Sequence, residues 1–205
     1  MSANAILGLL GCGLLGLAGL ATVIRLRRLP LRARYAVMLA AALAVFVPIG
    51  DLSIAAWVRG VTGDLSAATL VLAGAACIAQ VTGRALIGNR DKRALCRLLA
   101  LAAAFLYPFA LGWTPFDPYA LGFGSVEFVT ALLLVTLAAW SARLNLVVLV
   151  VVVAALAFLA GAYESRNLWD YLVDPFASFY ALAWLLAGVR LPNSVSLSRN
   201  SRQAD

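Results

Sequence analysis

The chain has 205 residues, of which 64% are hydrophobic and 12% charged, and its mean hydropathy is +0.96. Soluble domains average about 45–50% apolar and about 25% charged residues, so this composition predicts an integral membrane protein. No histidine is present, which excludes imidazole haem ligands, histidine-based zinc sites and catalytic triads with a histidine base. The three cysteines, Cys12, Cys77 and Cys96, lie in apolar runs, and their odd number favours buried free thiols over a disulfide framework or a metal cluster.

The first apolar run covers residues 4–24; no basic residue precedes it, and five arginines follow between positions 25 and 34. A secretory signal peptide has the reverse order, with its positive charge in front of a short apolar core. We therefore expect an uncleaved spanning helix with its N-terminus outside. Small residues recur along this run at a spacing that lets another backbone approach, either from this chain or from another protein. This predicted packing stripe consists of Gly8, Cys12, Gly16 and Gly19.

Six more apolar runs follow, most of them close to the roughly 20 residues that a spanning helix needs. They cover residues 35–50, 65–87, 94–113, 119–140, 144–163 and 176–189. The sequence therefore predicts an all-α, polytopic membrane protein with seven spans, six being the alternative count. One transmembrane domain covers residues 1–191, and the polar tail at 192–205 is expected to be disordered.

The distribution of charge predicts the orientation, because cytoplasmic segments collect Lys and Arg. With seven spans and the N-terminus outside, 14 of the 16 basic residues fall inside, all except Arg59 and Arg166. Seven of the nine acidic residues fall outside, all except Asp91 and Asp205. The C-terminus is then inside, and the arginine-rich, Ala/Gly/Leu-rich composition favours a bacterial inner membrane. The basic residues indicate contact with anionic lipid and not with nucleic acid, because no aromatic-basic platform accompanies them.

Three connections have a predicted shape. Residues 54–58 suit a short helix in the membrane interface with Trp57 as its anchor. Residues 88–92 form a polar inner turn between the third and fourth spans, with Gly88 and Asn89 ending a helix. Residues 141–143 form a tight turn, which makes the fifth and sixth spans antiparallel neighbours. The pairs Asp117-Pro118 and Asp174-Pro175 precede the fifth and seventh spans and suit helix N-termini, because Asp caps and Pro needs no amide partner.

Glu127 has two interpretations. If the fifth span starts at Tyr119, Glu127 lies about two turns inside the membrane, where an unpaired charge is costly. It is then a protonatable or cation-binding carboxylate in an outward-open pocket, paired with Arg59 or Arg166. If the helix starts near Gly124, Glu127 is a first-turn residue favoured by the positive end of the helix dipole.

The outer face is the strongest functional candidate, because carboxylates beside flat aromatic rings can hold a sugar or a cation. Interfacial aromatic residues and helix-capping acids are the alternative explanation of the same pattern. The candidate substrate-binding or cation-binding residues are Asp51, Asp117, Glu127, Glu164, Asp170, Asp174, Trp113 and Trp169.

No catalytic motif or phosphate-binding glycine loop is found, so the sequence leaves open whether the protein is an enzyme, and it predicts neither a metal nor a cofactor. The centres of most spans lack polar residues, which disfavours a conducting path. We expect a small component of a cell-envelope pathway that presents a lipid-linked or glycan substrate at its outer rim, or supports a larger membrane protein. The alternative is a proton-coupled or cation-coupled small-molecule transporter that uses Glu127. The expected partners are membrane lipids and another membrane protein.

Overall fold

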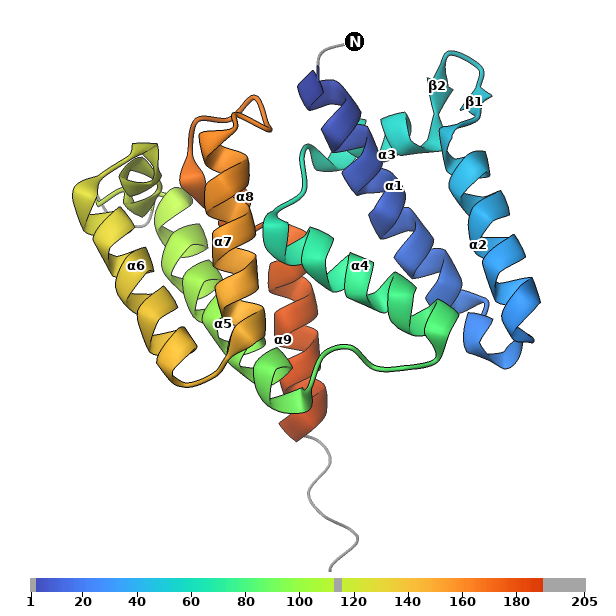
Figure 1. Cartoon of the computed structure of the whole chain (residues 1–205). Helices are drawn as coiled ribbons and strands as arrows, with labels where there is room; N and C mark the ends of the chain where they lie inside the picture. The colour runs from blue at the N-terminus through green and yellow to red at the C-terminus, as the bar shows by residue number, and fades with distance from the viewer. Residues whose placement is uncertain (1–2, 113–115, 190–205) are drawn as a thin grey trace, which may run out of the picture.

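The structure, a computed structural model, describes residues 3–112 and 116–189, and over these ranges the protein is all-α apart from one very short hairpin. Its long helices have 15 to 22 residues and alternate in direction along the chain (Figure 1). These helices are α1 (Ala3–Val23), α2 (Leu31–Phe46), α4 (Ala67–Thr82), α5 (Asn89–Ala110), α6 (Val126–Ser141), α7 (Asn145–Leu159) and α9 (Pro175–Val189). Each of the seven predicted apolar runs overlaps one of these helices, which confirms the all-α prediction.

Short elements join the long helices. The hairpin β1 (Pro48–Ile49) and β2 (Leu52–Ser53) leads into α3 (Ile54–Thr62), which extends the short helix predicted at 54–58 and leaves Trp57 62% exposed. The others are η1 (Leu26–Arg28), η2 (Pro118–Phe123) and α8 (Leu168–Leu172). The predicted tail at 192–205 lies outside the described residues.

Within the described ranges, one helical segment, Asn4–Val23, is long and apolar enough to cross a membrane, and 33% of its most apolar window is buried. Signal sequences and core helices of soluble proteins can be equally long and apolar. By length and composition, the described residues therefore contain one candidate membrane span. The shorter apolar helices have 10–17 residues. At a rise of about 1.5 Å per residue they are shorter than the roughly 30 Å of a hydrocarbon core.

The predicted boundaries around the connection between α4 and α5 are wrong. The helix α4 ends at Thr82 and not at 87, because Gly83 takes a left-handed conformation with φ 75° and closes the helix. The predicted turn at 88–92 is the start of α5 instead: Gly88 is the N-cap and Asn89 the first helical residue. A helix-ending interpretation of Gly88 therefore placed the break five residues too late.

The start of α6 decides between the two interpretations of Glu127. Asp117 and Pro118 begin η2 and not a long helix, so a helix start at Tyr119 is wrong. Gly124, at φ 93°, ends η2, and the Ser125 hydroxyl caps α6 by accepting from the amide of Phe128 at 3.2 Å. Glu127 is consequently an exposed residue of the first turn. Its carboxylate is favourably placed beside the unpaired amides of the helix start.

The helices pack around α4, which contacts α1 on one side and α7, α8 and α9 on the other. The larger hydrophobic core is shared by α4 to α9, and a smaller one between α1 and α4 contains Ala18, Ala73 and Cys77. All three cysteines are buried and free, as predicted. The tight turn after α6 is also confirmed: Arg143 takes a left-handed φ of 56°, and α6 and α7 pack together.

Candidate functional site

A pocket of about 380 Å³ lies between the α3–α4 connection and the segment from Tyr163 to Pro175. Helix α5 and η2 contribute its remaining walls. Carboxylates and hydroxyls provide its polar lining, and we call it the acidic pocket. Its polar side chains include Asp64, Tyr107, Tyr119, Tyr163, Ser165, Asp170 and Asp174.

Asp174 fastens the starts of two helices to each other. Its Oδ1 accepts from the hydroxyl of Thr69 and from the amide of Ala177, both at 2.7 Å, and its Oδ2 accepts from the amide of Ser66 at 2.8 Å. Ala177 is in the first turn of α9, whereas Ser66 is the N-cap of α4. The side chain is only 7% exposed. Both carboxylate oxygens of Asp174 therefore accept hydrogen bonds from donors within the protein. The two helix N-termini also favour a negative charge at this position.

Asp170 is held differently, because both of its hydrogen-bond donors bond to the same carboxylate oxygen. Its Oδ2 accepts from the hydroxyl of Tyr119 at 2.9 Å and from the hydroxyl of Ser165. Among the described residues, no hydrogen bond reaches Oδ1 of Asp170. Every buried side-chain oxygen of these residues has a partner, so Oδ1 is not buried. Burial, and then the bond to Asp170, raise the pKa of Tyr119 to about 12. Tyr119 therefore remains a donor at neutral pH, and Oδ1 of Asp170 is an acceptor open to the pocket.

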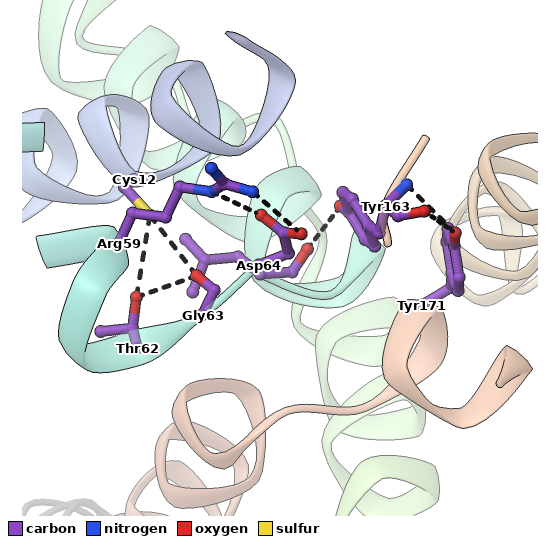
Figure 2. Close-up of polar contacts among 8 residues, drawn as sticks. Cys12, Arg59, Thr62, Gly63, Asp64, Tyr163 and Tyr171 are labelled. Carbon is purple, nitrogen blue, oxygen red and sulfur yellow. Dashed lines mark hydrogen bonds and ion pairs between the residues drawn. The ribbon is translucent and has the colours of Figure 1, made fainter. Parts of the chain in front are cut away.

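Asp64, which also lines the acidic pocket, forms an ion pair with Arg59. Nε of Arg59 lies 2.9 Å from Oδ1 of Asp64, and Nη2 lies 3.4 Å from Oδ2 (Figure 2). These bonds raise the pKa of the Arg59 guanidinium. The pair packs against Gly8 of α1, where an added Cβ would come within 2.2 Å of both Arg59 Nε and Asp64 Oδ1. Only a glycine accommodates this close approach without displacing the ion pair.

Two stacked tyrosines fix the loop that carries Ser165. The rings of Tyr163 and Tyr171 lie 4.6 Å apart at 19°, and Tyr171 is 1% exposed. The hydroxyl of Tyr171 accepts from the amide of Tyr163 and donates to the carbonyl of Ser165, both at 3.1 Å. The hydroxyl of Tyr163 donates to the carbonyl of Leu65, which ties this loop to the start of α4 (Figure 2). Burial raises the pKa of Tyr163 to about 12, so it too remains a donor.

The structure brings two of the predicted outer-face residues, Asp170 and Asp174, into the acidic pocket. Glu164 is exposed and lines a neighbouring depression with Arg59 and Asp64. Trp169 is buried behind the pocket, where its indole N–H donates to the carbonyl of Pro118 at 3.0 Å.

The other predicted site residues lie elsewhere. Asp51 is exposed beside the hairpin, and Glu127 is exposed at the start of α6. Asp117 is exposed and caps η2 by accepting from the amide of Tyr119 at 2.9 Å. None of these three lines the acidic pocket. Trp113 lies outside the described residues.

The predicted pairing of Glu127 with Arg59 is wrong, because Arg59 is paired with Asp64. Sequence reasoning placed Asp64 on the acidic outer face but did not select it as a binding candidate, and it did not select Tyr163 or Ser165. One local signal was present: Arg59 and Asp64 are five residues apart on the outer side of the predicted topology, close enough along the chain to pair. No comparable signal identified the serine and tyrosine, whose roles depend on distant partners.

The N-terminal and C-terminal halves of the predicted packing stripe have different surroundings. Gly8 meets the ion pair, and Sγ of Cys12 lies 3.7 Å from both the hydroxyl of Thr62 and the carbonyl of Gly63 (Figure 2). An added Cβ at Gly16 or Gly19 would meet nothing within 4 Å. The N-terminal half of the stripe therefore packs against the α3–α4 connection, and the other two glycines contact no neighbouring element closely.

No protein family, no curated protein and no solved structure matches this chain. The chemistry of the pocket therefore has to be derived from its own geometry. In the described part of the chain, no group of three or more Cys, Asp or Glu side chains is arranged to hold a metal ion. The acidic pocket of this all-α protein offers carboxylate acceptors and tyrosine hydroxyls. It is suited to ligand groups that donate hydrogen bonds, such as hydroxyls or amines, and disfavours anions.

Proposed function

We propose that this chain is a multi-pass protein of the bacterial inner membrane, with its N-terminus outside and its C-terminus inside. In this proposal the acidic pocket faces outward and binds the hydroxyl-rich glycan head of a lipid-linked or glycan envelope substrate. The protein presents that head to a larger membrane protein. Such a role requires binding and orientation, and it requires no catalytic group of the chain itself.

The arrangement of charge supports the membrane orientation. The alternating helices bring η1 and the connections from α4 to α5 and from α6 to α7 to one end of the molecule, the lower end in Figure 1. These segments are rich in arginine. The α3 helix, η2 and α8 lie at the other end with Asp64, Asp117 and Asp170. Separation of basic and acidic ends is the pattern that the positive-inside rule produces.

The observation that carries the ligand proposal is the open Oδ1 of Asp170. The second oxygen and the flanking hydroxyls are fixed by hydrogen bonds, so the open atom is held in place before a ligand arrives. A preorganised acceptor loses little conformational entropy on binding. Sugar hydroxyls can donate to it, while the tyrosine rings provide contact area. No Arg or Lys of the described residues lines the pocket, and the Arg59 guanidinium is already paired with Asp64, so the phosphate of a lipid-linked sugar is not expected to enter it.

The position of Glu127 does not favour the transporter alternative. This residue is exposed in the first turn of α6 and does not line the acidic pocket. A coupling carboxylate needs a route to both sides of the membrane, and a helix-terminal residue at one end does not provide one. We therefore propose no function for Glu127 beyond stabilising the start of α6.

Binding of a lipid-linked disaccharide tests the proposal. The probe is an undecaprenyl-pyrophosphate-linked disaccharide in nanodiscs, compared with undecaprenyl pyrophosphate that carries no sugar. We expect the purified protein to retain the first at least about tenfold better, a difference of about 1.4 kcal/mol. Asp170→Asn should abolish this preference, because it removes the charge of the acceptor while the remaining amide oxygen can still accept from Tyr119.

Asp117→Asn is the matched control, because Asp117 is an exposed cap outside the pocket and Asn caps about as well as Asp. Equal retention of the two probes by the unaltered protein, or loss of the preference in both variants, contradicts the ligand proposal. The orientation has its own test in reporter fusions at Ser2 and Asp205, and finding both termini on one side contradicts it.

A further inference from the structure

Two further pockets adjoin each other and extend from the starts of α4 and α9 towards the other end of the molecule. An apolar pocket of about 470 Å³ lies between α1, α4 and α9, and a polar pocket of about 270 Å³ lies between η1, α4 and the start of α5. Leu72, Ala76 and Tyr180 line both pockets, so the two pockets adjoin each other. We call the combined feature the basic groove.

The apolar part of the basic groove is lined by aliphatic and aromatic side chains, among them Leu15, Ala73 and Phe176. Two large residues along it are open to the surroundings, since Val23 is 80% and Phe176 40% exposed. Such a surface is costly in water but not against hydrocarbon. Its walls come from three helices and are mostly apolar, which suits an aliphatic chain.

The polar part contains two cations that come from distant parts of the sequence. Arg27 belongs to η1 and Lys92 to the first turn of α5. Nζ of Lys92 lies 5.1 Å from the ring centre of Tyr180 and 5.3 Å from that of Trp184. These rings orient the ammonium group by cation–π contact. Gln80 and Asn89 add amide donors to the same pocket.

No carboxylate of the described residues forms an ion pair with Arg27 or Lys92. The ion pair found among these residues joins Arg59 and Asp64, which do not line the basic groove. Asp91 is next to Lys92 in the sequence, but its Oδ1 accepts from the amide of Leu146 at 3.5 Å and so is directed to the start of α7. Asp91 does not line the polar pocket. The basic groove therefore has an unbalanced positive charge at one end and an apolar channel at the other.

We infer that the basic groove binds one anionic phospholipid, with its phosphate at Arg27 and Lys92 and an acyl chain along α1, α4 and α9. The inference rests on the membrane placement proposed above, which puts this end of the molecule at the inner leaflet. Basic pockets between helices on the cytoplasmic side are suited to anionic head groups. A free phosphate would use the cations alone, whereas a phospholipid uses both parts of the groove.

Native mass spectrometry of the detergent-purified protein with phosphatidylglycerol and phosphatidylcholine tests the inference. We expect one phosphatidylglycerol to be retained about tenfold better than phosphatidylcholine. The double variant Arg27→Gln with Lys92→Gln should lose that preference. The control double variant, Arg28→Gln with Arg93→Gln, removes the same number of charges from exposed neighbours that line neither pocket. It should keep the preference.

A second variant tests the apolar part without changing charge. Ala76 is half-buried and lines both pockets, so Ala76→Phe should obstruct the groove and lower retention of both lipids. Thermal melting of each variant, within a few degrees of the unaltered protein, shows that it is folded. Soluble glycerol 3-phosphate should not displace the lipid at equal concentration, because it has no acyl chain.

Equal loss of preference in both double variants would mean that surface charge alone attracts the lipid, and the inference would be wrong. Displacement by glycerol 3-phosphate would also overturn it, since the head group alone would then account for binding. Failure of the membrane placement is recognised separately, because the protein would then be recovered in the soluble fraction of cells. A protein that stays in the membrane fraction but shows no lipid preference contradicts this inference alone.

Discussion

The acidic pocket and the basic groove hold their charges in opposite ways. In the acidic pocket, Asp64 is paired with Arg59 and Asp174 accepts three hydrogen bonds from the protein. In the basic groove, Lys92 faces two aromatic rings and has no carboxylate partner among the described residues. Asp64 and Asp174 have their partners inside the fold, whereas the cations of the basic groove can take a counter-charge from outside.

Because of this difference, substitutions at the two sites should change different properties of the protein. Removing a carboxylate that satisfies buried donors leaves those donors unpaired and lowers the stability of the protein alone. Removing a cation that has no carboxylate partner leaves no buried acceptor unpaired, so its effect should be seen mainly in ligand retention. The variants below test whether the acidic end is indeed held together by its own polar contacts.

Asp174→Ala should have the largest effect on stability. It leaves the buried amides of Ser66 and Ala177 and the hydroxyl of Thr69 without their acceptor. We expect a loss of about 3 kcal/mol or more in the free energy of unfolding, measured by thermal or denaturant melting in detergent. Asp117→Ala is the control, because an exposed cap costs only about 1 kcal/mol. Equal losses in the two variants would contradict the role of Asp174 as the link between α4 and α9.

Tyr119→Phe should have an intermediate effect that depends on pH. It removes a hydrogen bond to a charged group, so we expect a loss of about 1.5 kcal/mol at neutral pH. The pKa of Tyr119 is raised to about 12 in the folded protein, above its ordinary value of 10. Between these values the folded state binds the proton more tightly than the unfolded state, so this contribution is complete below pH 10 and is lost as the pH rises towards 12.

Melting curves between pH 8 and pH 11.5 check this prediction. Stability of the unaltered protein should fall with rising pH in the alkaline part of this range, and the fall should be shallower in Tyr119→Phe. Tyr163, whose pKa is also raised to about 12, contributes in the same direction and should account for part of the remaining slope. An unchanged slope in Tyr119→Phe would show that the pKa of Tyr119 is not raised in the folded protein.

Gly8→Ala should have the smallest of the three effects. The added methyl group would collide with the ends of the Arg59 and Asp64 side chains, which can shift only by weakening their ion pair. We expect a net loss of about 1 kcal/mol. Gly16→Ala on the same helix meets nothing within 4 Å and should instead gain up to about 1 kcal/mol from helix propensity. Paired melting of the two variants measures the contrast, and two gains of similar size would show that the close packing at Gly8 is not needed.

The sequence predicted the order of helices because apolar runs and their interruptions are local properties. It was less accurate at their ends, where capping decides. Gly83 ends α4 with a left-handed conformation, and Ser125 starts α6 in preference to the Asp117-Pro118 pair. Glycine and serine also occur inside helices and loops, so several positions along the sequence could have ended or started these helices. The choice between them depends on how the neighbouring segments pack.

The candidate site shows the same division. The acidity of one end, and Asp170 and Asp174 as candidate residues there, followed from the sequence, because charge asymmetry and Asp-Pro starts can be recognised from neighbouring residues. The partners of these residues did not follow: the amide of Ser66 lies 108 positions from Asp174, and the hydroxyl of Tyr119 lies 51 positions from Asp170. Hydrogen bonds extend about 3 Å, so only the packing of α4 against α9, and of η2 against α8, decides which groups meet.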